Sequence, residues 1–235
     1  SAADRSRDLI AGFGELWSAR LLGTWLAQDV DPDRPVKWVD ARELIVVEHG
    51  EMGPAVCWPE SRVNAARLFG VDTHGIVVVT GFIASDPQGL QTTLGRNGSD
   101  FSASILAALL EAESISIWTD VDGVMSADPN RVPDATIISD LSYSEAMELA
   151  YFGAKVIHPQ TMSPAVERAI PIWIRNTFNP GVRGSRISVA ADASDGIKGV
   201  TSVDDVALIN LEGAGMIGVP GTADRLFGAL RDAGI

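Results

Sequence analysis

The chain has 235 residues, 46% hydrophobic and 21% charged, and its 31 acidic against 18 basic side chains give a formal net charge of −13. This composition is typical of a globular protein with a sizeable core, and it excludes collagen, disordered and disulfide-stabilised classes, because the single Cys57 cannot form an intrachain disulfide. The acidic balance argues against a nucleic-acid partner, and no apolar run approaches the ~20 residues of a membrane-spanning helix, so we expect a cytoplasmic protein with no membrane contact.

The first half of the sequence predicts helices and short strands. Apolar residues recur at helical spacing over 9–26, where Gly12 and Gly14 predict a break before a second helical piece that starts at Glu15. A further helix is predicted at 61–69. Short strands are predicted at three places: 36–39, 44–47 and 76–79. The last of these is apolar on both faces, as is typical of a central parallel strand.

The second half continues the alternation of helices and strands. Helices are predicted at 99–112, 142–152 and 163–169, and buried strands at 115–118 and 172–174. This order predicts an α/β fold, a three-layer sandwich with a mainly parallel sheet. A polar linker at 189–199 precedes a second unit, with a strand at 206–211 and a helix at 223–233.

The most specific stretch is a glycine-rich turn, Gly95-Arg96-Asn97-Gly98-Ser99-Asp100, which leads into the helix at 99–112. Glycines allow tight turns and a close approach to a ligand, and the free amides of a helix N-terminus favour an anion. The turn therefore suits a small charged molecule. An ordinary strand-to-helix turn with a surface arginine explains the same residues and remains an open alternative.

Two further stretches carry candidate binding residues. Asp120 and Asp122 follow the strand at 115–118, at the sheet edge where open parallel sheets bind ligands, and are suited to ribose hydroxyls or to waters around Mg²⁺. An Asx turn is the alternative for this pair. Lys155, in the loop after the helix at 142–152, is suited to a phosphate, although a lone lysine in a loop is more often solvated.

Several segments, taken together and in order, resemble aspartokinases, and Asn97 and Asp122 most resemble the kinase modules of bifunctional enzymes. These segments are 14–18, 94–100, 118–123, 142–149, 152–159 and 174–180. The resemblance implies the amino-acid kinase fold and the ATP-dependent phosphorylation of the side-chain carboxylate of L-aspartate. It also implies an amino-acid effector, lysine or threonine, and a homo-oligomer.

The resemblance also implies residue roles. Arg96 would bind the α-carboxylate of the substrate, Glu15 its ammonium group, and Asp100 would assist, so that Arg96, Asp100 and Lys155 form the catalytic set. The residues implied for the nucleotide are Thr119, Asp120, Met125, Arg131, Lys155 and Val156. Mg²⁺ is expected to arrive with ATP. Met125 stands where many relatives have tyrosine, and Asn130 where many have arginine.

Domain boundaries are expected at 1–190 for the kinase domain and 200–235 for the start of an α+β ACT regulatory domain. The family's phosphate-binding Gly-Gly turn is missing from the sequence, so we expect the kinase domain to be N-terminally incomplete and nearly inactive alone. Residues 213–218 match G-x-G-x-x-G, which leaves a Rossmann-type NAD(P) oxidoreductase as one alternative. A non-catalytic regulatory subunit is the other.

Overall fold

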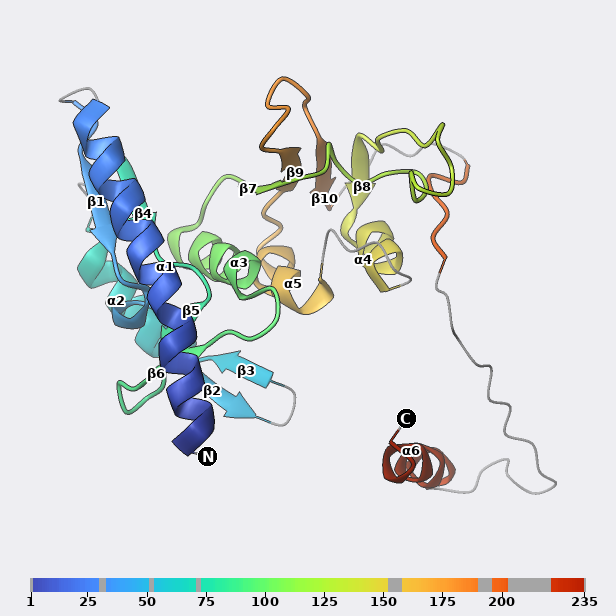
Figure 1. Ribbon diagram of the computed structural model, residues 1–235, viewed down its shortest axis with the longest axis horizontal. Helices are drawn as coiled ribbons and strands as arrows, with labels where there is room; N and C mark the ends of the chain where they lie inside the picture. The colour runs from blue at the N-terminus through green and yellow to red at the C-terminus, as the bar shows by residue number, and fades with distance from the viewer. Residues whose placement is uncertain are drawn as a thin grey trace. The chain divides into compact units, whose positions relative to one another are not determined.

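The computed structural model describes residues 2–29, 33–50, 53–70, 73–151, 158–189, 196–202 and 221–234 (Figure 1). The chain divides into two compact units, residues 1–202 and 203–235. In the second unit the helix predicted at 223–233 is present as α6, Thr222–Asp232. The strand predicted at 206–211 and the glycine motif at 213–218 lie outside the described residues. Among the described helices, none is both long and apolar enough to cross a membrane.

The first unit opens with one long helix, α1, Ala2–Asp29, so the predicted break at Gly12 and Gly14 is wrong. Gly12 is a packing residue, because a Cβ atom there would lie 2.9 Å from Cγ2 of Ile83. Gly23 is also buried on this side of the helix, but a Cβ atom there would make only an ordinary contact, 3.6 Å from Cβ of Trp38. The low helix propensity of glycine is offset by the close packing it permits, and Glu15 therefore lies in mid-helix.

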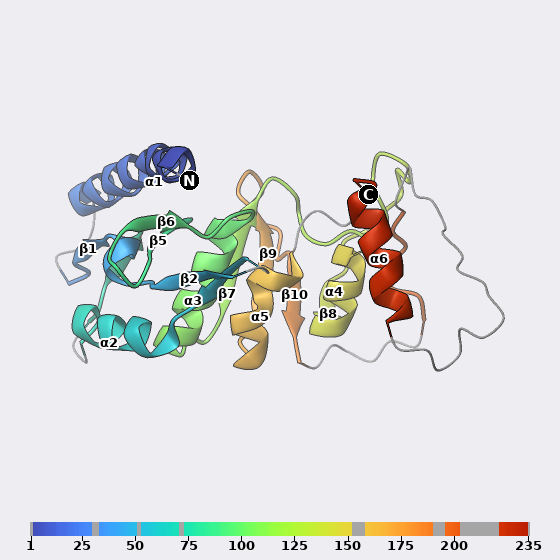
Figure 2. The same cartoon turned by 90° about the horizontal axis from the view of Figure 1, so that it is seen from below.

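A parallel pair of strands lies between two helices. β1, Val36–Val39, pairs in parallel with β4, Ile76–Val79, as the sequence predicts for both strands. Helix α1 lies on one side of this pair, and α2, Trp58–Leu68, lies on the other (Figure 2). This arrangement gives three layers. The apolar pattern of β4 predicts a central strand with a neighbour on each side. Among the described strands, however, β1 is its only neighbour.

Two hairpins and a short 3₁₀ helix surround this parallel pair. The 3₁₀ helix η1, Ala41–Glu43, directly precedes the stretch predicted as a strand at 44–47, of which Val47 alone begins a strand, and Leu44 and Ile45 are fully buried core residues. One hairpin joins β2, Val47–Gly50, to β3, Gly53–Val56. The other joins β5, Ile83–Ser85, to β6, Gln91–Thr93. Its second strand leads directly into the glycine-rich turn.

The second sheet has four strands in the order β7-β9-β10-β8. They are β7, Ile115–Thr119, β9, Ile172–Asn176, β10, Ser185–Ser188, and β8, Asp140–Ser142. β7 pairs in parallel with β9 and β10 in parallel with β8, whereas β9 and β10 are antiparallel. The predicted α/β class with parallel strands is thus confirmed.

Three helices cover one face of this sheet: α3, Gly98–Leu110, α4, Tyr143–Tyr151, and α5, Pro159–Glu167. They enclose a core around the buried side chains of Ile172, Ile174 and Ile187. The opposite face carries Trp118, Trp173 and Arg175, which are exposed or half-buried. The guanidinium of Arg175 lies over both indole rings, 5.8 Å and 5.0 Å from their centroids.

Candidate functional site

The glycine-rich turn places an uncapped helix N-terminus at the end of the β5–β6 hairpin. Gly95 and Asn97 both have positive φ, +74° and +55°, and this left-handed backbone reverses the chain between Leu94 and α3. Asn97 is the N-cap of α3, but its side chain makes no capping hydrogen bond. The first turn of α3 therefore has amide groups that are not satisfied by a capping side chain, which is the condition for binding an anion.

A buried serine fixes the shape of this turn. The hydroxyl of Ser102 accepts a hydrogen bond from the amide of Phe82 at 2.9 Å and donates one to the carbonyl oxygen of Gly98 at 2.9 Å. Gly98 is in close contact with Phe82, because a Cβ atom on Gly98 would lie 2.8 Å from Cδ2 of the phenyl ring. The hydrogen bonds of Ser102 thus hold the start of β5 against the start of α3, and the lack of a side chain at Gly98 allows this close contact.

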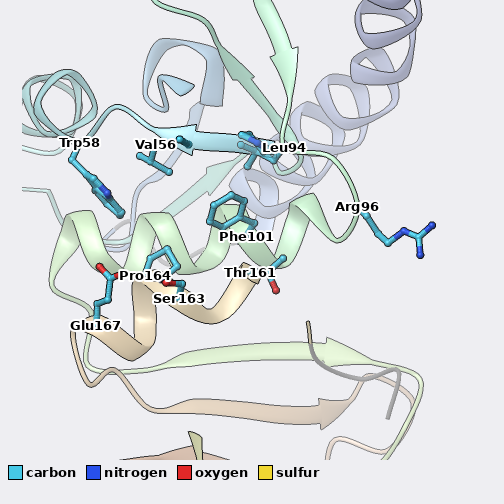
Figure 3. Close-up of a pocket in the computed structure, with 11 residues that line it drawn as sticks. Val56, Trp58, Leu94, Arg96, Phe101, Thr161, Ser163, Pro164 and Glu167 are labelled. Carbon is cyan, nitrogen blue, oxygen red and sulfur yellow. Dashed lines mark hydrogen bonds between the residues drawn. The ribbon is translucent and has the colours of Figure 1, made fainter. Parts of the chain in front are cut away.

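Two of the predicted site residues lie on this turn. Arg96 is exposed, and its guanidinium points into open space, away from the other labelled side chains in Figure 3. Asp100 lies in the first turn of α3 and is half-buried, and this burial raises the pKa of its carboxyl group. An exposed guanidinium and a partly desolvated carboxyl group on one helix end suit a ligand that carries both signs of charge.

A cavity of about 300 Å³ opens between the β2–β3 hairpin, α3 and α5 (Figure 3). Its walls are both apolar and polar, and Val56, Trp58 and Phe101 line it together with Ser163 and Glu167. Arg96 borders this cavity, but Glu15, Asp100 and Thr119 are not among its lining residues. The cavity therefore does not gather the predicted site residues.

The candidate site is instead the edge of the second sheet where β7 and β9 end. Both strands point toward the side on which Arg96 lies, and α3 runs in the opposite direction to β7 and packs against it (Figure 3). The N-terminus of α3 and the carboxyl ends of β7 and β9 therefore lie at the same edge. Open parallel sheets bind their ligands at this edge, and helix N-termini there attract phosphates and carboxylates.

Thr119 and Asp120 lie at the carboxyl end of β7. Thr119 is paired with Asn176 of β9, and its carbonyl oxygen accepts a hydrogen bond from the amide of Thr177 at 2.8 Å. The Thr119 hydroxyl donates to Oδ1 of Asp120 at 3.1 Å. Asp120 itself is exposed. This pair is accessible at the edge, as the sequence predicts for residues that contact a ligand.

Asp122 has a structural role in joining two loops. Its Oδ1 atom accepts hydrogen bonds from the side-chain amides of Asn176 at 2.8 Å and Asn179 at 3.2 Å. The side chain of Asn176 in turn accepts from the amide of Phe178 at 2.8 Å. The open alternatives for Asp122 were a ligand contact or a local turn, and these contacts favour a structural clamp between the ends of β7 and β9.

The remaining predicted residues lie on several different elements. Met125 is half-buried and forms an isolated antiparallel bridge with Ile137, and Arg131 is exposed in the following loop. Glu15 is half-buried on α1, beside Leu16, which belongs to the same core cluster as Leu94. The described contacts do not join Glu15 to Arg96. Lys155 and Val156 lie outside the described residues.

Four residues of this edge were missed by sequence reasoning as parts of the site. They are Phe82, Ser102, Asn176 and Asn179. The two asparagines belong to a segment that carries the aspartokinase resemblance, so their position was recognised but not their contact with Asp122. Ser102 gave no signal, because a serine within a predicted helix does not reveal which backbone groups it will contact.

Comparison with known proteins identifies the family. Residues 2–176 match the family model of the amino acid kinase family. The chain is 43% identical over 242 residues to "Bifunctional aspartokinase/homoserine dehydrogenase 1, chloroplastic" from Arabidopsis thaliana, a match that covers 99% of this chain and 26% of the relative. The chain thus spans about a quarter of the length of the curated relatives it matches.

Solved structures with the same fold include aspartokinase III from Escherichia coli. In its complex with aspartate and ADP (R-state) that protein is 34% identical, with a TM-score of 0.72, and the match covers 79% of this chain and 41% of that one. In its complex with lysine and aspartate (T-state) it is 30% identical with a TM-score of 0.72, covering 96% of this chain and 50% of that one.

Proposed function

The chain belongs to the amino acid kinase family, and from this premise we propose that it is the kinase portion of an aspartokinase, which transfers the γ-phosphoryl group of ATP to the side-chain carboxylate of L-aspartate. The observation that carries the proposal is the convergence at one sheet edge of the uncapped N-terminus of α3 and the carboxyl ends of β7 and β9. Relatives named as aspartokinases support the choice of substrate.

The chemistry suits a site without a conspicuous base. A carboxylate is ionised at neutral pH, so the attacking oxygen needs no proton removed from it. Catalysis then depends on aligning the two substrates and neutralising the charge of the transferred phosphoryl group. The product is 4-phospho-L-aspartate with ADP. The attacking carboxylate, the transferred phosphoryl group and the leaving ADP are all anionic, which is why backbone amides and cations at the edge of the sheet suit this reaction.

On the aspartate side we assign three residues. Arg96 binds the α-carboxylate through a two-point contact that a lysine cannot reproduce. Glu15 receives the substrate ammonium group, and Asp100 assists it. The exposure of Arg96 and the burial of Asp100 support this assignment, because the first leaves the guanidinium available and the second leaves a carboxyl group that gains from a cationic partner.

On the nucleotide side we assign Thr119, Asp120, Met125 and Arg131 to the lining of the site, together with Lys155 and Val156. Magnesium enters as the MgATP complex, bound chiefly to the phosphates. The accessible position of Asp120 at the end of β7 supports this half of the assignment. The proposal also includes a homo-oligomer, cytoplasmic location, a C-terminal ACT domain at 200–235, and feedback inhibition by lysine or threonine.

Ligand-induced thermal stabilisation discriminates this function from its alternatives. A ligand that binds only the folded chain raises the melting temperature with increasing concentration. We expect L-aspartate and MgADP each to raise it, and L-glutamate and NAD(P) to leave it unchanged. Stabilisation by lysine or threonine without any by L-aspartate would instead support the regulatory subunit, and stabilisation by NAD(P) the oxidoreductase. Either of those results would contradict the proposal.

A further inference from the structure

Part of the linker lies against the first unit and is bonded to it. The described linker residues 196–202 belong to that unit and run beside the loop between β7 and β8 (Figure 1). The amide of Val200 donates a hydrogen bond to the carbonyl oxygen of Ser126 at 2.8 Å. We call residues 198–200 the strap. The strap is thus attached to the loop that carries Met125 and Arg131.

The two residues before Val200 fit the strap to its neighbours. A Cβ atom on Gly199 would lie 3.2 Å from the carbonyl oxygen of Ser126 and 3.2 Å from Cδ1 of Ile138, so the chain passes close to the loop. The side chain of Lys198 is 16% exposed, and its Nζ atom lies 3.0 Å from Oε1 of Glu145 on α4. The strap therefore contacts the loop and α4 together.

The loop between β7 and β8 begins and ends in a short antiparallel ribbon, formed by residues 124–126 and 136–138. Two hydrogen bonds between backbone groups, both 2.8 Å long, join these two segments. At the base of the ribbon, the amide of Val124 donates to the hydroxyl of Ser185 on β10 at 2.8 Å, and both residues are buried. The base of the ribbon is therefore fixed to the second sheet.

Ser126 departs from regular pairing in a way that serves the strap. In a regular antiparallel ladder, the residues of a hydrogen-bonded pair donate to each other's carbonyl oxygens. The amide of Ser126 donates to the carbonyl oxygen of Thr136 at 2.8 Å, but the amide of Thr136 donates to the hydroxyl of Ser126 at 3.0 Å. The hydroxyl of Ser126 takes the place of its own carbonyl oxygen, which accepts the amide of Val200 instead.

The tip of the loop keeps its shape through its own contacts. Oδ1 of Asp128 accepts a hydrogen bond from the amide of Asn130 at 2.9 Å. The carbonyl oxygen of Asp128 accepts the amides of Arg131 and Val132, both at 2.9 Å. A tip with such internal contacts moves together with the ribbon below it, so the position of Arg131 depends on how the ribbon is held.

We propose that the strap is a positioning element for nucleotide binding, because its bond to Ser126 holds the ribbon that carries Met125 and leads to Arg131. The inference rests on the proposed function, in which these two residues line the nucleotide site. Neither the strap nor Ser126 belongs to the aspartate half of that site. Loss of the strap contact should therefore lower the affinity for the nucleotide and leave the affinity for L-aspartate unchanged.

Two variants test the proposal in calorimetric titrations of MgADP and of L-aspartate into the 235-residue chain. Gly199→Val adds a side chain at the tight contact with Ser126. Gly70→Val is its control, because nothing lies within 4 Å of the position where the Cβ of Gly70 would be. Ser126→Ala leaves the amide of Thr136 to compete with that of Val200 for one carbonyl oxygen, and Ser126→Thr, which keeps the hydroxyl, is its control.

We expect Gly199→Val and Ser126→Ala to bind MgADP ~3–10-fold more weakly than wild type, as the loss of one hydrogen bond implies. Both should bind L-aspartate as wild type does. Gly70→Val and Ser126→Thr should match wild type in both titrations. Hydrogen–deuterium exchange without ligand should be ~10-fold faster for the amides of residues 124–138 in Gly199→Val and Ser126→Ala, as in a locally opened segment.

Several results would overturn the proposal. Wild-type affinity for MgADP in both Gly199→Val and Ser126→Ala would do so, whether or not exchange is faster, because the nucleotide would then not depend on the strap. An equal loss of affinity for MgADP and L-aspartate would show a general loss of structure instead of positioning. A wild-type chain that binds no MgADP would contradict the proposed function and the inference together, whereas failure of the inference alone leaves wild-type binding intact.

Discussion

The hydroxyl group of Ser102 accepts a hydrogen bond from the amide of Phe82, 20 residues earlier in the chain. Ser102 is 2% exposed, and the same hydroxyl donates to the carbonyl of Gly98 in the first turn of α3. One buried hydroxyl thereby sets the distance between the start of β5 and the helix N-terminus at which we place the substrate. The geometry of the aspartate half of the site depends on this contact.

Replacing Ser102 by alanine should damage both stability and substrate binding. The amide of Phe82 loses its partner in a half-buried position, and leaving a polar group there unsatisfied costs on the order of 1 kcal/mol. We expect unfolding in urea to show a loss of that size and L-aspartate to bind more weakly. Ser104→Ala is the control, because Ser104 is equally buried on α3 but, among the described residues, has no hydrogen bond to this turn. If both variants lost the same stability and the same affinity for L-aspartate, Ser102 would have no special role in shaping this turn.

Asp100→Asn should stabilise the fold while weakening substrate binding. Burial raises the pKa of Asp100, so the folded protein holds this proton more tightly than the unfolded chain. Its contribution to stability is therefore present at low pH and is lost as the pH rises through the raised pKa. Asparagine carries no charge, so we expect a melting temperature ~2 °C higher than wild type at pH 7, a modest value because the side chain is only half-buried.

The pH dependence supplies the check on that variant. The difference in melting temperature should shrink toward pH 3, where the wild-type carboxyl group is protonated in both states. The affinity for L-aspartate should fall about tenfold, because a charge-assisted hydrogen bond to the ammonium group is lost. A variant that is less stable at pH 7, or that binds L-aspartate as tightly as wild type, would be incompatible with our account of Asp100.

Alanine substitutions of the two aspartates after β7 should have different effects, one on stability and the other on nucleotide binding. Asp122→Ala leaves the side-chain amides of Asn176 and Asn179 without their shared acceptor, and we expect a loss of about 1–2 kcal/mol in the free energy of unfolding. Asp120→Ala removes an exposed side chain and should leave stability within ~0.5 kcal/mol of wild type while lowering the affinity for MgADP. Urea unfolding and nucleotide titration of both variants check these assignments. A loss of stability in Asp120→Ala, with a loss of MgADP affinity in Asp122→Ala alone, would contradict them.

An ion pair connects the described part of the linker to α4. Lys198 lies 3.0 Å from Oε1 of Glu145, whose other carboxylate oxygen accepts a hydrogen bond from the amide of Ser142 at 2.7 Å. The hydrogen bond from the Ser142 amide, together with Lys198, lowers the pKa of Glu145. Stability from a lowered carboxyl pKa is present above the unfolded value and is lost as the pH falls through the folded value.

Lys198→Met tests this connection. We expect the variant to melt ~1–2 °C below wild type at pH 7, since a partly exposed ion pair contributes little. The difference should shrink as the pH falls through the lowered pKa of Glu145, where its carboxylate becomes protonated, and in high salt, which screens the pair. A difference that persists unchanged at pH 3 would show that the ion pair is not its cause.

The sequence predicted best the elements that are long or strongly apolar. The strand at 76–79 and the helix at 99–112 were recognised from their own side chains, and the structure has both as β4 and α3. The short polar strands β8 and β10 were missed, because Asp140–Ser142 and Ser185–Ser188 have no apolar run and are defined by pairing with neighbours. The error at Gly12 has the same origin, since the packing of α1 on Ile83 outweighs glycine's low helix propensity.

The candidate site divides in the same way. The turn around Arg96 and the polar end of β7 were recognisable as candidate binding residues from the sequence itself. Glycines before a helix and aspartates after a buried strand are both short local patterns. Their meeting at one edge followed from the order of strands and helices. The clamp formed by Asp122 with Asn176 and the contact of Ser102 with Phe82 could not be predicted, because each joins segments 20 or more residues apart through side-chain geometry.

The most direct test of the account is a calorimetric titration of L-aspartate, with L-glutamate in parallel, into the wild-type chain and into Arg96→Ala. Arg62→Ala, at an exposed arginine of α2, is the matched control. The account predicts that the wild type and Arg62→Ala bind L-aspartate and not L-glutamate, and that Arg96→Ala loses binding at least ~10-fold, as expected for a charged two-point contact. Unchanged binding in Arg96→Ala, or no selectivity for L-aspartate over L-glutamate in the wild type, would contradict it.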